Sequence, residues 1–431
     1  MTVRGAAVDS APGPRPSEED SLRLILPGGG VPLGFVRQGD EVFLVARDRG
    51  ARWPVEVLRS GSATLSIGGR SEPGAAELLV DPSEKLRVLE SFRQKYGDRR
   101  YERWYRDPAR VLKVRLGRAG VPSGGSAGYY RWLTAEFDNV ADEYDRHILG
   151  NRINRLLRDR SLSQLRATFA GDRRLLEIGC GSGMETLPLL GEGHEVFCVD
   201  VSDRMLDVVR EKARRAGVLE RLETRRLTAA SLPDLLADPG PGAFDGAYST
   251  YGALNCEADL RPIPPALHAL IRPEGRFVAG VYNRWCVFEL VGYSLTGQFG
   301  RAWGRTGRPV RVGSSRFCID VFAHSAAGFA EAFSPWFVRE RVEGVPVLLP
   351  PSDLVGYADR SGDGFERWAR WDRYLGSRWP FRLLGDHFLM TLRRADSVSR
   401  RPSVELPLPY EMRRSRTDPA EPGASGRAQG V

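Results

Sequence analysis

Residues 175–190 place one acidic side chain next to three closely spaced glycines. A short apolar run, Leu175, Leu176 and Ile178, precedes glycines at positions 179, 181 and 183, and an amphipathic segment follows them. A strand, a glycine turn and a helix in this order present backbone N–H groups to an anionic ligand. The dinucleotide fingerprint requires a glycine at position 184, where the chain has Met184. The spacing therefore indicates a ligand that has no pyrophosphate.

Residues 177–183 resemble motif I of the class I S-adenosylmethionine-dependent methyltransferases, in which an acidic residue and one spacer precede Gly-x-Gly-x-Gly. The resemblance implies an α/β fold with a Rossmann-like, seven-stranded sheet that binds S-adenosylmethionine. It assigns ten residues to the cofactor site: Glu177, Gly179, Cys180, Gly181, Gly183, Asp200, Val201, Met205, Ser249 and Tyr144.

Residues 194–200 predict a second buried strand that ends in a carboxylate. Asp200 lies about 20 residues beyond the glycines, where this architecture places the acid that binds ribose hydroxyls. The alternative role for Asp200 is a helix N-cap, which Ser202 or Asp203 fills equally well. Further matches to the family follow in order: a fourth strand and loop at 244–250, a turn into the fifth at 271–277, a helix from Ser325 to Phe333, a sixth strand at 337–342 and a seventh at 387–392.

The segment before the glycine motif has a different sequence pattern. It predicts short strands at 31–36, 41–46, 63–67, 77–80 and 111–116 and one helix at 82–96. This order resembles the split β-barrel (α+β) of the flavin- and deazaflavin-dependent nitroreductase and pyridoxamine-phosphate-oxidase-like superfamily. Trp53 falls where those proteins carry a tryptophan before a small strand, but no asparagine follows within 53–58. The resemblance implies FMN or deazaflavin, and a barrel that has lost its cofactor is the alternative.

Composition shifts predict the domain organisation. We expect a disordered tail at 1–20, a split β-barrel domain at 21–118, a Gly/Ser linker at 119–128, a methyltransferase domain at 129–395 and a disordered tail at 396–431. Phe137, Val140, Ala141 and Tyr144 share one helical face. In the family, the tyrosine of this helix closes over the cofactor, and core packing is the alternative role.

Charge and cysteine usage exclude several classes of protein. The net charge is +8, but the arginines are interspersed with acids, so nucleic-acid binding is not expected. No apolar run reaches the roughly 18 residues of a membrane span, and the N-terminus has no apolar core, so a cytoplasmic location is predicted. The five cysteines form no Cys-x-x-Cys pair, so neither a metal site nor a disulfide framework is predicted. The oligomeric state stays open.

Methyl transfer needs alignment of donor and acceptor, and a base only where the acceptor must lose a proton. Tyr251 and Asn255 follow the predicted fourth strand and are candidates for orienting an acceptor. His147 and His324 are the candidate bases, whereas His194, His268 and His387 are expected to be structural.

Six of the nine tryptophans follow the predicted fifth strand. They indicate either an apolar acceptor pocket or insertions that pack onto the domain. The sequence therefore predicts a methyltransferase for a small, hydrophobic metabolite. The alternatives are a bifunctional flavin- or deazaflavin-dependent reductase and methyltransferase, a non-catalytic S-adenosylmethionine-binding module, and an NAD-dependent oxidoreductase, which Met184 disfavours.

Overall fold

The computed structural model describes residues 21–26, 29–46, 53–79, 81–106, 108, 110–117, 126–171, 173–306, 310–314, 317–354 and 364–396. The chain divides into two compact units. The first is Met1–Val140 with Val312–Ile319, and the second is Ala141–Arg311 with Asp320–Val431. The predicted tails, apart from Asp396, and most of the predicted linker lie outside the described residues.

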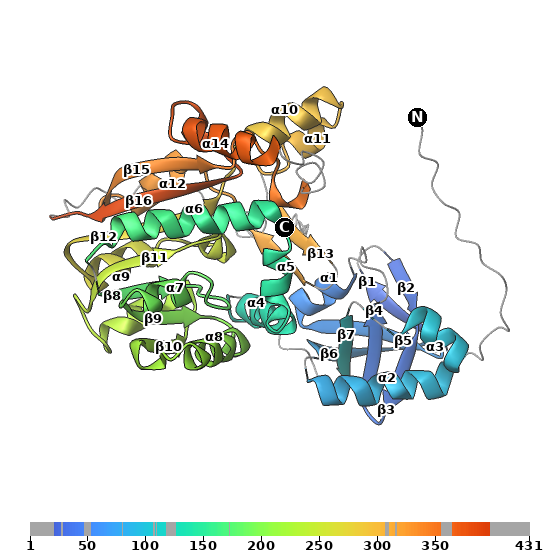
Figure 1. Cartoon of the computed structure of the whole chain (residues 1–431). Coiled ribbons are helices and arrows are strands. Elements are labelled where there is room, and N and C mark those ends of the chain that lie inside the picture. Colours follow the sequence, from blue (N-terminus) through green and yellow to red (C-terminus); the bar gives the residue numbers. More distant parts are fainter. Residues whose placement is uncertain are drawn as a thin grey trace, which may run out of the picture. The chain divides into compact units, whose positions relative to one another are not determined.

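The first unit contains an antiparallel sheet in the order β2-β1-β5-β6-β7-β4-β3 (Figure 1). Its strands are β1 (Leu22–Leu26), β2 (Gly29–Leu33), β3 (Phe35–Gln38), β4 (Glu41–Ala46), β5 (Ser62–Ile67), β6 (Arg70–Leu78) and β7 (Arg110–Leu116). The two outermost strands, β2 and β3, are consecutive in the chain and separated by Gly34 alone. One bent segment therefore pairs with β1 through its first half and with β4 through its second, so the sheet closes on itself.

Gly34 is required at this bend, because a Cβ atom there would lie 2.2 Å from the Tyr105 hydroxyl oxygen. The next residue, Phe35, donates its backbone N–H to the Tyr96 hydroxyl at 2.9 Å. Both tyrosines pack against Phe92 in an apolar cluster of this unit. The resemblance to the split β-barrel superfamily stays a prediction.

The helices of the first unit are α1 (Trp53–Ser60), α2 (Pro82–Tyr96), α3 (Asp98–Trp104) and α4 (Ser126–Val140). The predicted helix 82–96 is confirmed, and the Asp81 side chain caps it through the backbone N–H of Glu84. The expectation of a small strand after Trp53 is wrong, because Trp53 begins a helix and is buried. In α4, Glu136 forms a fully buried ion pair with Arg110 of β7.

The second unit contains a seven-stranded sheet in the order β10-β9-β8-β11-β12-β16-β15. The strands are β8 (Arg174–Ile178), β9 (Glu195–Asp200), β10 (Leu222–Arg226), β11 (Phe244–Ser249), β12 (Ile271–Tyr282), β15 (Phe337–Val345) and β16 (His387–Arg394). Strands β8 to β12 are mutually parallel, and β16 is antiparallel to both of its neighbours. The predicted sixth and seventh strands are confirmed, and the α/β fold is that of the class I methyltransferases.

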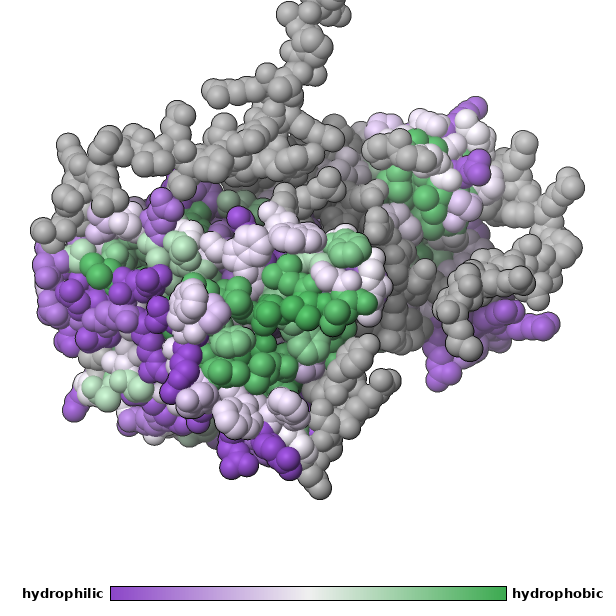
Figure 2. All heavy atoms as spheres, turned by 90° about the horizontal axis from the view of Figure 1, so that it is seen from above, coloured by the Kyte–Doolittle hydropathy of each residue, from purple (hydrophilic) through white to green (hydrophobic). Residues whose placement is uncertain are grey.

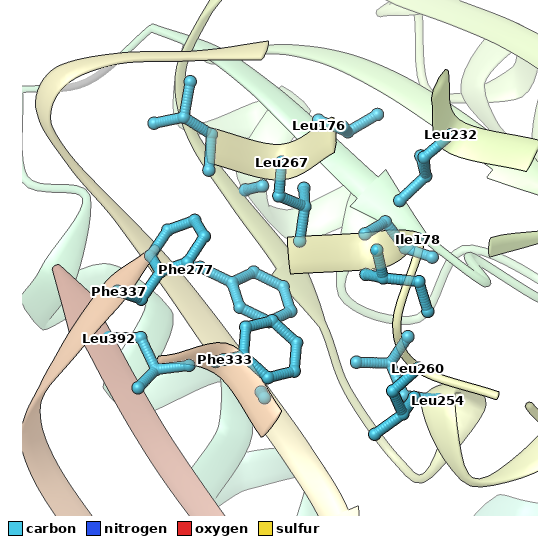
Figure 3. Packing of buried hydrophobic residues seen from close by; sticks show 14 of the residues in the cluster. Leu176, Ile178, Leu232, Leu254, Leu260, Leu267, Phe277, Phe333, Phe337 and Leu392 are labelled. Atoms are coloured by element: carbon cyan, nitrogen blue, oxygen red, sulfur yellow. The ribbon is translucent and has the colours of Figure 1, made fainter. Parts of the chain in front are cut away.

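Helices cover both faces of this sheet (Figure 1). Because side chains alternate along a strand, Leu175 and Leu176 of β8 enter two different cores. Figure 3 shows the core around Leu176, where Phe277, Phe333 and Phe337 pack together. The helices are α5 (Tyr144–Leu149), α6 (Arg152–Thr168), α7 (Thr186–Gly191), α8 (Asp203–Arg215), α9 (Ile263–Leu270) and α12 (Ala326–Phe333), with 3₁₀ segments η2 (Leu219–Arg221), η3 (Ala229–Leu236) and η4 (Ala253–Cys256).

Insertions follow β12 and β15. The first holds α10 (Val287–Leu295), α11 (Phe299–Ala302) and the hairpin β13 (Val310–Ser314) and β14 (Phe317–Val321); the second holds η5 (Ser352–Leu354), α14 (Gly364–Gly376) and η6 (Phe381–Leu383). The predicted helix after Ser325 is confirmed, since the Ser325 hydroxyl accepts the Gly328 N–H. In the part of the chain that the structure describes, no helix has the length and apolar character to cross a membrane.

Candidate active site

The glycine loop that follows β8 lies at the carboxyl ends of the parallel strands. Gly179, Gly181 and Gly183 have φ values of 72°, 52° and 80°, in the left-handed region that favours glycine. A Cβ atom at Gly179 would lie 2.4 Å from Ala253, and one at Gly183 would lie 2.3 Å from Val209. At Gly181 the nearest atom is Tyr144 Cε1, at 3.9 Å. The outer glycines are thus required by packing, whereas Gly181 borders open space beside Tyr144.

Asp200 ends β9 directly beside this loop. Its carboxylate accepts the backbone N–H of Gly181 at 2.8 Å and that of Ser202 at 2.9 Å. Ser202, as expected, caps α8 by accepting the N–H of Met205 at 3.0 Å. Asp200 therefore ties the loop to the second strand and is not itself the cap of α8. Met205 is fully buried, and Val201 is partly exposed.

Glu177 lies beneath the loop rather than on its open side. The carboxylate accepts hydrogen bonds from the hydroxyls of Thr186 and Tyr248, the latter at 3.0 Å, and the Cys198 thiol lies 3.4 Å away. Burial raises the pKa of Glu177 to about 7, although these hydrogen bonds oppose the rise. Glu177 thus supports the loop from within the core.

The raised pKa of Glu177 predicts a pH-dependent stability. An unfolded glutamate has a pKa of about 4.3, so between that pH and about 7 the folded chain binds more protons than the unfolded chain. The free energy of unfolding should therefore fall as pH rises through this window, by about 4 kcal/mol at most. Thermal melts of the wild type and Glu177→Gln across this range should show a smaller slope in the variant. An identical pH dependence of stability in the wild type and in Glu177→Gln would contradict a raised pKa of Glu177.

A buried ion pair faces Tyr144 across the same site. Arg158 of α6 pairs with Glu185, which precedes α7, and its guanidinium carbon lies 3.9 Å from the centroid of the Tyr251 ring. Two atoms of the pair, Arg158 Nε and Glu185 Oε1, are buried and have no hydrogen-bond partner among the described residues. Burial raises the pKa of the Tyr144 hydroxyl, and Arg158 opposes that rise. Among the described residues, this ion pair therefore leaves one donor and one acceptor unsatisfied.

A second group of side chains meets Tyr251 from the start of β16. The His387 ring stacks on Tyr251 with centroids 6.0 Å apart, and it meets Tyr282 edge-on at 5.3 Å. His387 Nδ1 lies 3.0 Å from Asp386 Oδ2. Asp386 in turn accepts a hydrogen bond from Arg305 at 2.7 Å. The sequence analysis assigned His387 a structural role and did not identify Asp386.

Asp386 fixes the protonation of the His387 ring. Burial raises the pKa of the Asp386 carboxyl, but Arg305 and His387 outweigh that effect and hold it at about 2. An ionised carboxylate only accepts hydrogen bonds, so Nδ1 of His387 carries the proton. In the neutral ring Nε2 is then the acceptor, and no described group is hydrogen-bonded to it. The geometry leaves His387 able to take a proton through Nε2.

Two predicted site residues are used within the fold. The Asn255 amide is buried: it donates to the carbonyls of Tyr282 and Phe322 at 3.1 and 2.7 Å and accepts the Tyr282 N–H at 2.8 Å. Ser249 is also buried, and its hydroxyl donates to the Ile178 carbonyl at 2.9 Å. Both residues hold the ends of the strands together rather than presenting polar groups to a ligand.

The structure does not bring His147 and His324 to the ring of Tyr251. His147 is exposed on α5. His324 forms an isolated β-bridge with Asn283, which follows β12. Burial is the main cause that lowers the pKa of His324 to about 4, and repulsion from Arg284 adds to it. Cys180 is buried in the core beside the loop. Of the predicted site residues, the structure thus groups Gly181, Asp200, Tyr144 and Tyr251.

Comparison with known proteins agrees with this geometry. Residues 175–275 match a family model described as a methyltransferase domain. A tRNA 5-carboxymethoxyuridine methyltransferase of Escherichia coli (strain K12) is 24% identical over 34% of this chain and 56% of its own length. A malonyl-[acyl-carrier protein] O-methyltransferase of Halorhodospira halophila is 31% identical over 42% of this chain and 55% of its own. The solved CcbJ methyltransferase of Streptomyces caelestis is 17% identical, with a TM-score of 0.41 over 61% of this chain and 98% of its own.

The match to the methyltransferase domain lies on the elements that build the glycine loop, within the seven-stranded α/β sheet. This chain therefore carries a region, residues 175–275, that is similar to methyltransferase domains. It spans about half the length of the curated relatives that it matches.

Proposed function

We propose that this chain transfers the methyl group of S-adenosylmethionine to a small, hydrophobic acceptor. The observation that carries the proposal is the convergence of the glycine loop, the Arg158–Glu185 pair and the Tyr251–His387 stack at the carboxyl ends of the strands. The names of the relatives, which include a ubiquinone biosynthesis O-methyltransferase, give three different kinds of acceptor. The acceptor is therefore argued from the site alone.

The residues beside the loop fit the cofactor. S-adenosylmethionine has an amino-acid part with a carboxylate and an ammonium group, and a ribose with two hydroxyls. Among the described residues, Arg158 Nε is a buried donor without a partner and Glu185 Oε1 is a buried acceptor without one, which suits these two opposite charges. Asp200, at the end of β9, is the residue that we assign to the ribose hydroxyls. The open space at Gly181 allows a close approach to the backbone.

The bound cofactor supplies a methyl group already activated on a sulfonium. The protein then has to align the acceptor, exclude water and accept a proton where the acceptor carries one. The rings of Tyr251, Tyr282 and His387 suit a planar, apolar acceptor. We assign His387 as the base. When the acceptor bonds to the methyl group, the S–CH3 bond breaks and S-adenosylhomocysteine is the leaving group, while Nε2 takes the proton of the acceptor and Asp386 stabilises the resulting imidazolium.

The test is incubation of the whole protein with methyl-labelled S-adenosylmethionine and small-molecule extracts. Transfer of label to a compound extracted into organic solvent is expected. Label found only in macromolecules would contradict the acceptor class, and cofactor binding without any transfer would favour a non-catalytic binding module. Calorimetry with S-adenosylmethionine and with NADH separates this proposal from an oxidoreductase, because only S-adenosylmethionine should bind to a methyltransferase.

For the first unit we keep the split β-barrel and the predicted domain limits as proposals. The closure of the sheet at Gly34 supports a barrel. The relatives named above are methyltransferases, and they give the flavin or deazaflavin prediction no support. The visible absorption spectrum of the purified protein tests it, since a bound flavin absorbs there and apoprotein does not.

A further inference from the structure

The two insertions of the second unit leave large apolar side chains exposed. Figure 2 shows hydrophobic residues gathered on the side where Figure 1 places α10, α11 and α14. Leu295 is 83% exposed and Trp379 is 75% exposed. The insertion patch, as we name it, consists of Val291, Leu295, Phe299, Trp303, Trp368, Trp371, Tyr374 and Trp379. Four of the tryptophans for which the sequence left a pocket and packing open belong to this patch and are at least half exposed. An exposed apolar surface of this kind marks an interaction site.

Helix α14 presents aromatic side chains on its exposed face. Trp368, Trp371 and Tyr374 recur every three residues and are all about half exposed. The inner face is anchored: Phe365 is buried, and the buried Asp372 accepts the backbone N–H groups of residues 347–349 at 2.7–3.0 Å. The helix is therefore held in place with its aromatic stripe outward.

The first insertion is anchored beside the end of the second. The backbone N–H of Val287, at the start of α10, donates to the Leu384 carbonyl at 2.9 Å. Behind α11, the buried Arg305 pairs with both Glu289 and Asp386. These bonds leave Leu295 and Phe299 at the outer end of the insertion, away from the buried ion pairs. The patch is thus built on fixed elements of one unit.

The charges next to the patch are almost all positive. Within α10, α11 and α14, all of whose residues are described, Glu366 is the one exposed carboxylate, because Glu289 and Asp372 are buried. The exposed basic residues of these helices are Arg301, Arg367, Arg370 and Arg373. The three arginines of α14 recur every three residues, as its aromatic residues do, and form a stripe next to the aromatic one. Aromatic residues flanked by arginines are typical of surfaces that lie in the interface of a bilayer.

We propose that the insertion patch binds the surface of an anionic phospholipid bilayer. Trp371, Leu295 and their neighbours enter the boundary between headgroups and acyl chains, while the arginines contact lipid phosphates. The described residues of α10, α11 and α14 expose four arginines and one carboxylate, and this balance of charge complements the negative plane of anionic headgroups. This inference does not depend on the proposed methyl transfer, since its test reads lipid binding alone.

The test is co-sedimentation of the whole protein with vesicles. We expect binding to vesicles of phosphatidylcholine with phosphatidylglycerol, much weaker binding to phosphatidylcholine alone, and a blue shift of tryptophan fluorescence on binding. Leu295→Glu should weaken binding about tenfold or more, and Arg370→Ala should weaken it about fivefold. Trp104→Glu, at an exposed tryptophan of the first unit, is the matched control and should bind like the wild type. An unchanged far-ultraviolet circular dichroism spectrum and an unchanged melting temperature show that each variant is folded.

Three outcomes would overturn the proposal. The first is equal binding to neutral and anionic vesicles, which removes the role of the arginines. The second is a loss of binding in Trp104→Glu equal to that in Leu295→Glu. The third is an absence of vesicle binding together with a concentration-dependent dimer that Leu295→Glu abolishes in the analytical ultracentrifuge, which assigns the patch to a second copy of the chain.

Discussion

Arg158→Ala is expected to weaken binding of S-adenosylmethionine by about a hundredfold or more. The guanidinium has a buried Nε that lacks a hydrogen-bond partner among the described residues, and we assign it to the carboxylate of the cofactor. Charge-assisted hydrogen bonds contribute about 1.5–3 kcal/mol each, and two of them correspond to at least this loss of affinity. Isothermal titration with S-adenosylhomocysteine measures the change.

The controls separate binding from folding. Arg158→Ala leaves Glu185 buried without its cation, so Arg158→Ala/Glu185→Gln should recover thermal stability without recovering affinity. Arg166→Ala, on the same helix, removes an exposed pair with Glu192 and should leave affinity unchanged. Wild-type affinity in the Arg158→Ala variant would remove Arg158 from the cofactor site.

His387→Gln is expected to lower kcat by about a hundred- to ten-thousandfold, the range for loss of a general base. The affinity for S-adenosylmethionine should stay unchanged, because His387 faces Tyr251 and Tyr282 rather than the glycine loop. Initial rates with the acceptor found by labelling measure kcat, and isothermal titration measures the affinity for S-adenosylmethionine. A fall in kcat with an unchanged affinity supports the assignment of His387 as the base.

The other histidines provide the matched comparison. His147→Gln and His324→Gln replace the two bases that the sequence suggested, and the structure places neither against Tyr251. Both variants should retain kcat within about threefold of the wild type, since neither loses a group assigned to proton transfer. A large loss in His324→Gln with none in His387→Gln would reverse the assignment.

Much of the second unit could be predicted, because its determinants are local. Glycines at every second position require left-handed backbone, and a buried strand must precede them. Ser202 and Ser325 were recognisable as caps for the same reason, since a hydroxyl before an amphipathic run is enough.

The polar partners of the site were not predictable in this way. Arg158 and Glu185 are 27 positions apart in the chain, and only the tertiary fold brings them together. In a chain with 63 basic residues, one arginine gives no distinguishing pattern. His387 lies in a strand, and its role depends on Asp386 being held by Arg305, 81 residues away. Asn255 was chosen for its position after β11, but its amide is used by backbone groups.

The division of the chain also limits how the protein can be taken apart. Residues Val312–Ile319 belong to the first unit, although they lie inside an insertion of the second. The backbone therefore passes between the units three times: after Val140, after Arg311 and after Ile319. A single cut near the predicted linker leaves part of the first unit, including Phe317, which packs on Phe137, attached to the second. The two units consequently cannot be exchanged as independent cassettes, and a fusion or truncation has to replace the hairpin as well.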